Sequence, residues 1–410
     1  MKVNKKIEKI NFIWNMIGTT FNSFNSLFFM ILVTRINGIE SAGIFTFAYS
    51  TACLFYVIGS YSGRTYQVTD EDDYNDSIYF YSKIITCIFM ILSIILFCFI
   101  KEYSFYKIVI IILLGLFKML EALSETFYAI IQKDNELHIV GKSMFLKAII
   151  SLILFFIVDV ITKNLILSCL FIILTNLLII LFYDLRNIKN KKFKLEKIDI
   201  NKTIELLKKG FFAFGFAFMT LYIINAPKYS VDVYMSNKDQ TILGIIIMPA
   251  TIIILFSQYI IQPFIIKMKN TIAKGRKEFD KIILKIVFFI CLVGGVSIIC
   301  SWLLGIPVLE LLYGVELDKY LVALITIIIG ATIYGISVVY STALTTLRKT
   351  FCQFIAFLIT SIFAFVISDM LTKSNGIFGA CYSYMITMIF LLFIYIIIYK
   401  YQLLKKWKNK

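Results

Sequence analysis

The sequence predicts an all-α integral membrane protein, with twelve transmembrane helices arranged as two six-helix bundles and both termini in the cytoplasm. Of its 410 residues, 60% are hydrophobic and 16% are charged, and the mean hydropathy is +0.86. Soluble domains are about 45–50% apolar and about 25% charged. The apolar residues gather in blocks of about 20, the length that crosses a hydrocarbon core as a helix. The Lys and Arg residues between the blocks fall mostly on one side of the predicted membrane, as the positive-inside rule requires.

Twelve apolar blocks follow one another along the chain, with short polar stretches between them. They cover residues 11–34, 44–62, 78–100, 107–131, 144–161, 165–185, 210–230, 241–266, 282–304, 321–342, 351–370 and 376–399. The longest hydrophilic stretch, "RNIKNKKFKLEKIDINKTIELLKKG" (186–210), separates six blocks from six. We therefore expect an N-terminal six-helix bundle over residues 1–200 and a C-terminal six-helix bundle over residues 201–410.

The net charge of +16 reflects membrane topology. With the N-terminus in the cytoplasm, the large majority of the 41 Lys and Arg residues lie in cytoplasmic segments, where they face anionic lipid of the inner leaflet. We therefore predict anionic membrane lipid as a partner and no binding of nucleic acid. The sequence shows no convincing P-loop, nucleophile elbow or metal-ligand cluster, which argues against an enzyme.

The fourth block carries three charges on one helical face. Within "LLGLFKMLEALSETFYAIIQ" (113–132), Lys118, Glu121 and Glu125 fall inside an arc of roughly 60° at 100° per residue. An ionised residue at the centre of a membrane helix costs about 2.5–3.5 kcal/mol, so three cost on the order of 9 kcal/mol if they face lipid. The stripe is therefore expected to face the bundle interior or a water-filled cavity.

Two interpretations of this charged face stay open. Lys118 and Glu121 are spaced i,i+3 and would form an internal ion pair that holds the helix in register. Glu125 would then have no partner, and an unpaired buried carboxylate tends to bind a proton or a cation. The face would otherwise bind cargo or a coupling ion, with Glu121 and Glu125 as the ion-coupling groups. Lys118 is the one cation placed deep in an apolar block, whereas Arg35 and Arg64 lie near block edges.

A second polar stripe lies on the first block, within an arc of roughly 100°: Asn11, Asn15, Asn22, Asn25 and Ser26. Amides on such a stripe either bond neighbouring helices or line a hydrated cavity and meet sugar hydroxyls. Arg64 follows the second block, at headgroup depth, where its planar guanidinium suits a phosphate and also serves as a positive-inside anchor.

Two stretches resemble a known family. "SAGIFTFAYSTACLFYVIGSYSGRTYQVTDEDD" (41–73), with its Gly-Ile-Phe opening and Arg-x-Tyr-Gln-Val-x-Asp ending, resembles the second-span region of bacterial Wzx-type polysaccharide flippases. "KMLEALSETFYAIIQKDNELHIVGKSMFLKA" (118–148) is similar to their fourth-span region. The family belongs to the multidrug/oligosaccharidyl-lipid/polysaccharide exporter (MOP) superfamily. The resemblance implies a MATE-like fold, with two bundles that rock around a central cavity.

The resemblance also implies a function in the synthesis of surface polysaccharides such as O-antigen, lipopolysaccharide or capsule. The cargo would be an undecaprenyl-pyrophosphate-linked oligosaccharide, moved from the inner to the outer leaflet of the bacterial cytoplasmic membrane. Lys118, with Arg64 near the cytoplasmic mouth and Arg35 at a block edge, would bind the diphosphate, and Asn15, Asn22 and Asn25 would meet sugar.

No cofactor is expected beyond a coupling proton or sodium ion, and other polysaccharide-assembly membrane proteins are expected partners. The alternatives are a multidrug-type cation antiporter, with Glu121 and Glu125 binding the drug, and a membrane glycan polymerase or ligase.

Overall fold

The chain folds into helices throughout the residues that the structure describes. The structure is a computed structural model, and it describes residues 5–61, 63–69, 74–189, 193, 195–272, 275–347 and 349–407. Asp70, which ends the motif of the second-span region, lies outside these residues. The regular elements are all helical, as predicted. The fold separates into two compact units, Met1–Phe218 and Met219–Lys410.

Ten helical stretches among the described residues are long and apolar enough to cross a membrane. The charged helix α5 (Phe105–Lys133) is not one of the ten, because its charges interrupt the apolar run. Helix α15 (Thr350–Trp407) covers two predicted spans, and its backbone breaks at Gly376, with φ 59° and ψ −137°. The number of twelve spans and the cytoplasmic position of the termini remain predictions.

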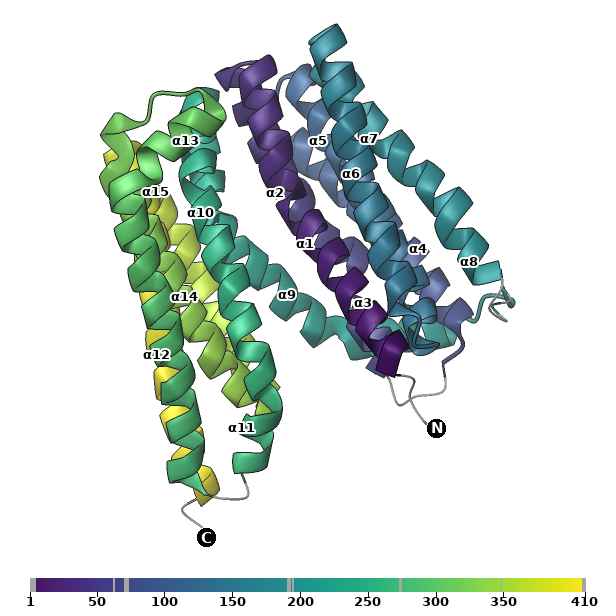
Figure 1. The fold of residues 1–410 in the computed structure, drawn as a ribbon, viewed down its shortest axis with the longest axis vertical. Coiled ribbons are helices and arrows are strands. Elements are labelled where there is room, and N and C mark those ends of the chain that lie inside the picture. Colours follow the sequence, from purple (N-terminus) through teal and green to yellow (C-terminus); the bar gives the residue numbers. More distant parts are fainter. Residues whose placement is uncertain are drawn as a thin grey trace. The chain divides into compact units, whose positions relative to one another are not determined.

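Unit 1 surrounds α5 with other helices of the same unit. Its helices run side by side (Figure 1), and α5 contacts α2, α3, α4 and α7, while α1 packs on α6. This arrangement places the charged stripe of α5 inside the unit. The elements are α1 (Lys5–Ile36), α2 (Ile39–Ser60), α3 (Gly63–Thr69), α4 (Asp76–Lys101), α5, α6 (Leu137–Thr162), α7 (Leu165–Ile179), the π-helical turn η1 (Ile180–Asp184), α8 (Leu185–Lys189) and most of α9 (Ile200–Tyr234).

Two glycines allow α1 and α6 to approach closely. A Cβ atom at Gly18 would lie 2.2 Å from the carbonyl oxygen of Gly141, and a Cβ atom at Gly141 would lie 2.2 Å from that of Trp14. No side chain fits at either position, so the two backbones touch directly. Small residues serve this purpose between membrane helices, where close packing replaces the hydrophobic effect.

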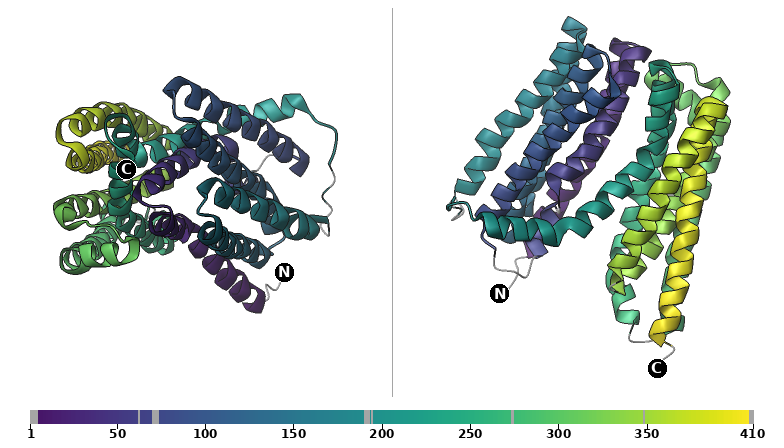
Figure 2. Two further views of the ribbon diagram at one scale, coloured as in Figure 1. Left: turned by 90° about the horizontal axis from the view of Figure 1, so that it is seen from above. Right: turned by 180° about the vertical axis from the view of Figure 1, so that it is seen from behind.

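Unit 2 is organised around α14, which packs on α10, α12 and α15 (Figure 2). Its elements are α10 (Asn237–Ile261), η2 (Gln262–Phe264), α11 (Ile265–Thr271), α12 (Arg276–Cys300), η3 (Ser301–Gly305), α13 (Ile306–Tyr313), η4 (Asp318–Tyr320), α14 (Leu321–Thr346) and α15. One end of the unit has a core in which Phe279, Leu347 and Leu403 are buried together. The chain passes from unit 1 to unit 2 within α9, between Phe218 and Met219. The boundary predicted between the two bundles, residues 1–200 and 201–410, falls at the start of the same helix and stays a prediction.

Candidate functional site

Lys118 and Glu121 form an ion pair inside unit 1. The Lys118 Nζ donates to Glu121 Oε2 at 2.6 Å, and the side chains are 10% and 17% exposed. The same ammonium lies 4.8 Å from the centre of the Tyr49 ring and 4.9 Å from that of Phe117. The predicted i,i+3 pair is therefore present, and two aromatic rings on α2 and α5 add cation–π attraction to it.

Glu125 also has a cationic neighbour, whereas the ion-pair interpretation of the sequence assigned it no partner. Arg64 Nε lies 4.0 Å from Glu125 Oε2. Arg64 reaches α5 because it lies on α3, which packs against α5 and begins at Gly63, whose φ of 71° favours glycine. Arg64 of α3 therefore lies beside the charged stripe of α5, which carries Lys118, Glu121 and Glu125.

A buried ion pair between α6 and η1 was missed by sequence reasoning. Lys147 Nζ donates to Asp184 Oδ2 at 2.6 Å, and the two side chains are only 6% and 1% exposed. The same ammonium donates to Ser124 Oγ at 2.7 Å and to the Tyr128 hydroxyl at 2.9 Å. The second carboxylate oxygen of Asp184 accepts from Ser143 Oγ at 2.6 Å. Two features of the sequence could have indicated this pair: Asp184 lies inside an apolar block, and Ser143 and Lys147 are spaced i,i+4.

Lys83 on α4 is a further enclosed cation near this group. Its Nζ donates to the carbonyl oxygen of Ser60 at the end of α2. Lys83, Lys118 and Lys147 are all buried. The expectation that Lys118 is the one deeply placed cation is therefore wrong as regards burial, because helix packing encloses lysines that stand near block edges in the sequence.

Together these residues form what we call the charged cluster of unit 1. Within it, Glu125 lies in electrostatic range of Arg64, Lys83 and Lys147, and Lys147 in range of Glu121. Four cations face three carboxylates, so the cluster carries one net positive charge when all are ionised. Its members are Arg64, Lys83, Lys118, Glu121, Glu125, Lys147 and Asp184.

A small cavity opens beside the cluster. Its volume is about 40 Å³, which holds a few waters at most. Glu121, Glu125 and Lys147 contribute to its wall, whereas Lys118 and Arg64 do not. The lining residues are Asn22, Tyr56, Glu121, Ser124, Glu125, Tyr128, Met144 and Lys147. The site therefore offers both carboxylates and an ammonium to a small hydrated space, with serine and tyrosine hydroxyls between them.

This arrangement supports ionic recognition and provides no metal site. No group of three or more His, Cys, Asp or Glu side chains is placed to hold a metal ion in the part of the chain that the structure describes. Lys118 is held by a carboxylate and Lys147 by a carboxylate and two hydroxyls, whereas Lys83 is held by a backbone carbonyl.

The chain was compared with known proteins. Models of known protein families give no match. The chain is similar to the capsular polysaccharide biosynthesis protein CapF of Staphylococcus aureus, with 24% identity over 396 residues, which are 95% of this chain and 98% of that protein.

Solved transporter structures share the fold over nearly the whole chain. An inward-facing multidrug resistance MATE family transporter of the MOP superfamily gives a TM-score of 0.69 at 9% identity, covering 97% of this chain and 99% of that one. The lipid II flippase MurJ, in an inward closed conformation, gives 0.65 at 18% identity, covering 97% and 90%. The MATE transporter VcmN of Vibrio cholerae gives 0.63 at 11% identity, covering 97% and 98%.

The chain has the fold of the MOP-superfamily transporters. The shared fold confirms the resemblance seen in residues 41–73 and 118–148 at the level of the superfamily fold. The similarity to CapF, which is named for capsular polysaccharide biosynthesis, agrees with it. The predicted multi-pass membrane character is confirmed as well: ten helical stretches among the described residues are long and apolar enough to cross a membrane, and the fold is shared with membrane transporters.

The remaining predicted residues of this MOP-fold chain occupy different environments. Asn22 lines the cavity, and Asn25 is buried. The side-chain oxygen of Asn15 is buried without a hydrogen-bond partner among the described residues. Arg35 is exposed at the end of α1 and is not part of the charged cluster.

The far end of the asparagine stripe has a structural role. Asn11 Nδ2 donates to the carbonyl oxygen of Asn135 at 2.6 Å, and Asn11 Oδ1 accepts from the backbone N–H of His138 at 2.9 Å. These bonds fix the start of α1 to the α5–α6 loop. The stripe therefore includes helix attachment at Asn11 and a cavity wall at Asn22, and contact with sugar stays a prediction.

Proposed function

We propose that this chain is a flippase for undecaprenyl-pyrophosphate-linked oligosaccharide repeat units. It moves them from the inner to the outer leaflet by alternating access between two six-helix bundles, with twelve spans and both termini in the cytoplasm, and it is not an enzyme. The observation that carries the proposal is the excess of cations in the charged cluster of unit 1. A net positive site favours an anionic cargo, and arginine and lysine are suited to phosphate oxygens.

In this proposal the diphosphate takes over cations that carboxylates hold at rest. Lys118 leaves Glu121 for a phosphate oxygen, and Arg64 does the same from Glu125. Lys147 already lines the cavity and provides the first contact. Because about 40 Å³ admits only a few waters, the cavity has to open before a diphosphate enters.

The released carboxylates of Glu121 and Glu125 then bind the coupling proton or sodium ion. A carboxylate that loses its cationic partner in a low-dielectric site gains affinity for a proton or a cation. Asn15, Asn22 and Asn25 would meet sugar hydroxyls, and Arg35 would act at the edge of the span.

The relatives support a glycan cargo. CapF is named for capsular polysaccharide biosynthesis and MurJ is a lipid II flippase. These names favour a lipid-linked glycan in general, and the assignment to O-antigen or lipopolysaccharide remains part of the proposal. Association with other polysaccharide-assembly membrane proteins is proposed on the same basis.

A cation antiporter is the second candidate, and one observation favours it. Glu121 and Glu125 both line the cavity, where they would meet a cationic drug directly, and the fold is shared with multidrug resistance transporters. The two candidates differ in the sign of the charge on the cargo.

The deciding experiment measures both activities in one host. Cells that make a cognate lipid-linked glycan but lack its flippase would receive the wild-type chain or Lys118→Ala, with protein levels matched. We expect the wild-type chain to restore surface polysaccharide, Lys118→Ala to lose it, and resistance to cationic drugs to stay unchanged. Drug resistance without surface polysaccharide would favour the antiporter, and polysaccharide that changes in chain length would favour a polymerase.

A further inference from the structure

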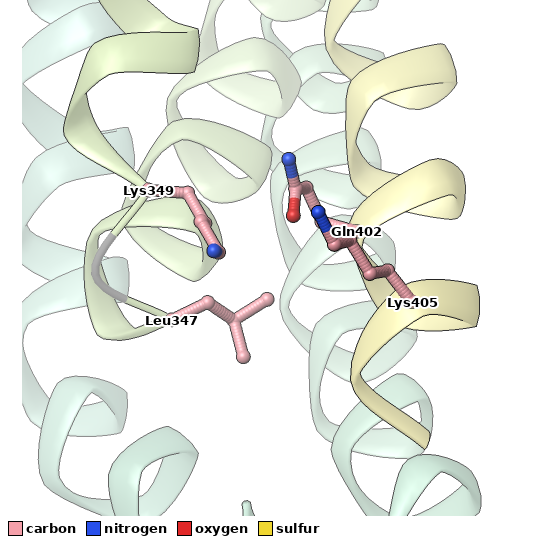
Figure 3. Close-up of a pocket in the computed structure, with 4 residues that line it drawn as sticks. All are labelled: Leu347, Lys349, Gln402 and Lys405. Atoms are coloured by element: carbon pink, nitrogen blue, oxygen red, sulfur yellow. The ribbon is translucent and has the colours of Figure 1, made fainter. Parts of the chain in front are cut away.

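Unit 2 contains a second cavity, where α14 ends and α15 begins. Its volume is about 310 Å³, room for several waters, and Leu347, Lys349, Gln402 and Lys405 line it. Figure 3 shows Lys349 on one side of the space and Gln402 and Lys405 on the other, with the polar ends of all three directed into it. This cavity is much larger than the one beside the charged cluster.

No described carboxylate neutralises the charges that line this cavity. Neither Lys349 nor Lys405 forms an ion pair with a carboxylate among the residues that the structure describes. Gln402 is 9% exposed; its Nε2 donates to Cys352 Sγ at 3.3 Å, and its Oε1 is buried without a partner in the described chain. Two lysines that pair with no described carboxylate, beside an amide oxygen without a described partner, would suit an anion that also brings hydrogen-bonding groups.

The predicted topology puts the cavity at the depth of lipid headgroups. Helix α14 ends at Thr346 and α15 begins at Thr350, so the cavity lies between two predicted spans, residues 321–342 and 351–370, where a cytoplasmic turn is expected. Leu347 belongs to the same buried core as Phe279 of α12 and Leu403 of α15, so that end of unit 2 includes the start of α12. Helix α11 and the first half of α12 are rich in cations, and these attract anionic lipid: Lys267, Lys269, Arg276, Lys277, Lys281 and Lys285.

We propose that this cavity binds a phosphate ester, and that its source is the headgroup of an anionic phospholipid. Lys349, between α14 and α15, and Lys405, near the end of α15, hold the phosphate, and Gln402 of α15 supplies the polar floor. The acyl chains stay in the bilayer beside unit 2. The inference concerns a site in unit 2 and does not depend on which cargo the charged cluster of unit 1 transports.

Native mass spectrometry of the purified full-length chain tests the proposal. The chain in detergent would be titrated with phosphatidylglycerol, with phosphatidylcholine as a lipid without net charge and with glycerol 3-phosphate as a soluble phosphate ester. A lysine beside an anionic lipid contributes about fivefold to affinity, so Lys349→Gln with Lys405→Gln should weaken phosphatidylglycerol binding roughly 30-fold.

Matched variants separate this site from general charge. The double change Lys319→Gln and Lys373→Gln removes the same charge from exposed positions of unit 2 outside the cavity and should leave binding within about twofold, and Lys349→Arg with Lys405→Arg should retain it. If the double glutamine variant does not elute as folded protein, Lys405→Gln alone should lose about fivefold.

Equal phosphatidylglycerol binding by the wild-type chain and folded glutamine variants would overturn the site. Glycerol 3-phosphate bound as tightly as the lipid, and lost in the same variants, would overturn the lipid headgroup as its source.

Discussion

The buried pair of Lys147 and Asp184 gives the sharpest test of how unit 1 is built. Neither side chain reaches solvent appreciably, so removing one partner leaves the other as a buried, uncompensated charge. We predict that Asp184→Leu or Lys147→Met alone lowers the free energy of unfolding by about 3–5 kcal/mol. The double variant, Lys147→Met with Asp184→Leu, should be far less destabilised.

The structure explains why the double variant is tolerated. Ser124 Oγ also donates to the carbonyl oxygen of Leu120 at 2.9 Å, and the Tyr128 hydroxyl lies 2.9 Å from Ser143 Oγ. All three hydroxyls therefore keep a partner after both charges are removed. A buried ion pair replaced by apolar residues of similar volume is commonly neutral or stabilising, and we expect the double variant within about 1–2 kcal/mol of the wild-type chain.

Thermal unfolding in detergent, followed by size-exclusion chromatography of fluorescent fusions, measures the ranking. Both single variants should aggregate at a clearly lower temperature than the wild-type chain. The aggregation temperature of the double variant should be higher than that of either single variant and at most equal to that of the wild-type chain. The double variant should also lose transport although it folds, because Lys147 lines the cavity. Additive losses of stability in the double variant would refute the reasoning.

Three further predictions follow from particular contacts. Lys118→Gln should reduce surface polysaccharide roughly tenfold in the complementation host, while Lys118→Arg, which keeps the charge, leaves more activity at equal protein level; equal loss in both would contradict a direct role for the charge of the lysine. Gly18→Ala should destabilise unit 1 by about 1–3 kcal/mol through a clash with α6 in thermal unfolding, whereas Gly295→Ala, with open space around it, should not. Tyr61→Phe should lower thermal stability by about 0.5–1.5 kcal/mol, since it removes a 2.8 Å hydrogen bond to α9 and keeps the ring stacked on Phe214; an unchanged melting curve would argue against that bond.

The helical, membrane-spanning character was predictable because it depends on the length and composition of apolar blocks. The inward orientation of the charged stripe on α5 was predictable from helix periodicity, because three charges within roughly 60° cannot face lipid. The Lys118–Glu121 pair followed from i,i+3 spacing, and the structure contains it.

Contacts between distant segments were not readable from helix periodicity. The partner of Glu125 comes from α3 after a turn, and Asp184 sits in a π-helical turn, which changes the direction of its side chain relative to a regular helix. Lys83 and Lys147 stand near the ends of apolar blocks, where lysines usually reach headgroups, and only the packing of α4 and α6 shows that they are enclosed.

The most direct test of the central claim removes the charges of one ion pair without changing net charge. Lys118→Gln with Glu121→Gln would be compared, in the flippase-deficient host, with Arg276→Gln and Asp280→Asn, which removes the 3.6 Å i,i+4 pair of α12 in unit 2. We predict that the α12 variant restores surface polysaccharide as the wild-type chain does and that the α5 variant, present at equal level, does not. Full restoration by the α5 variant would contradict the claim that the charged cluster of unit 1 handles the cargo.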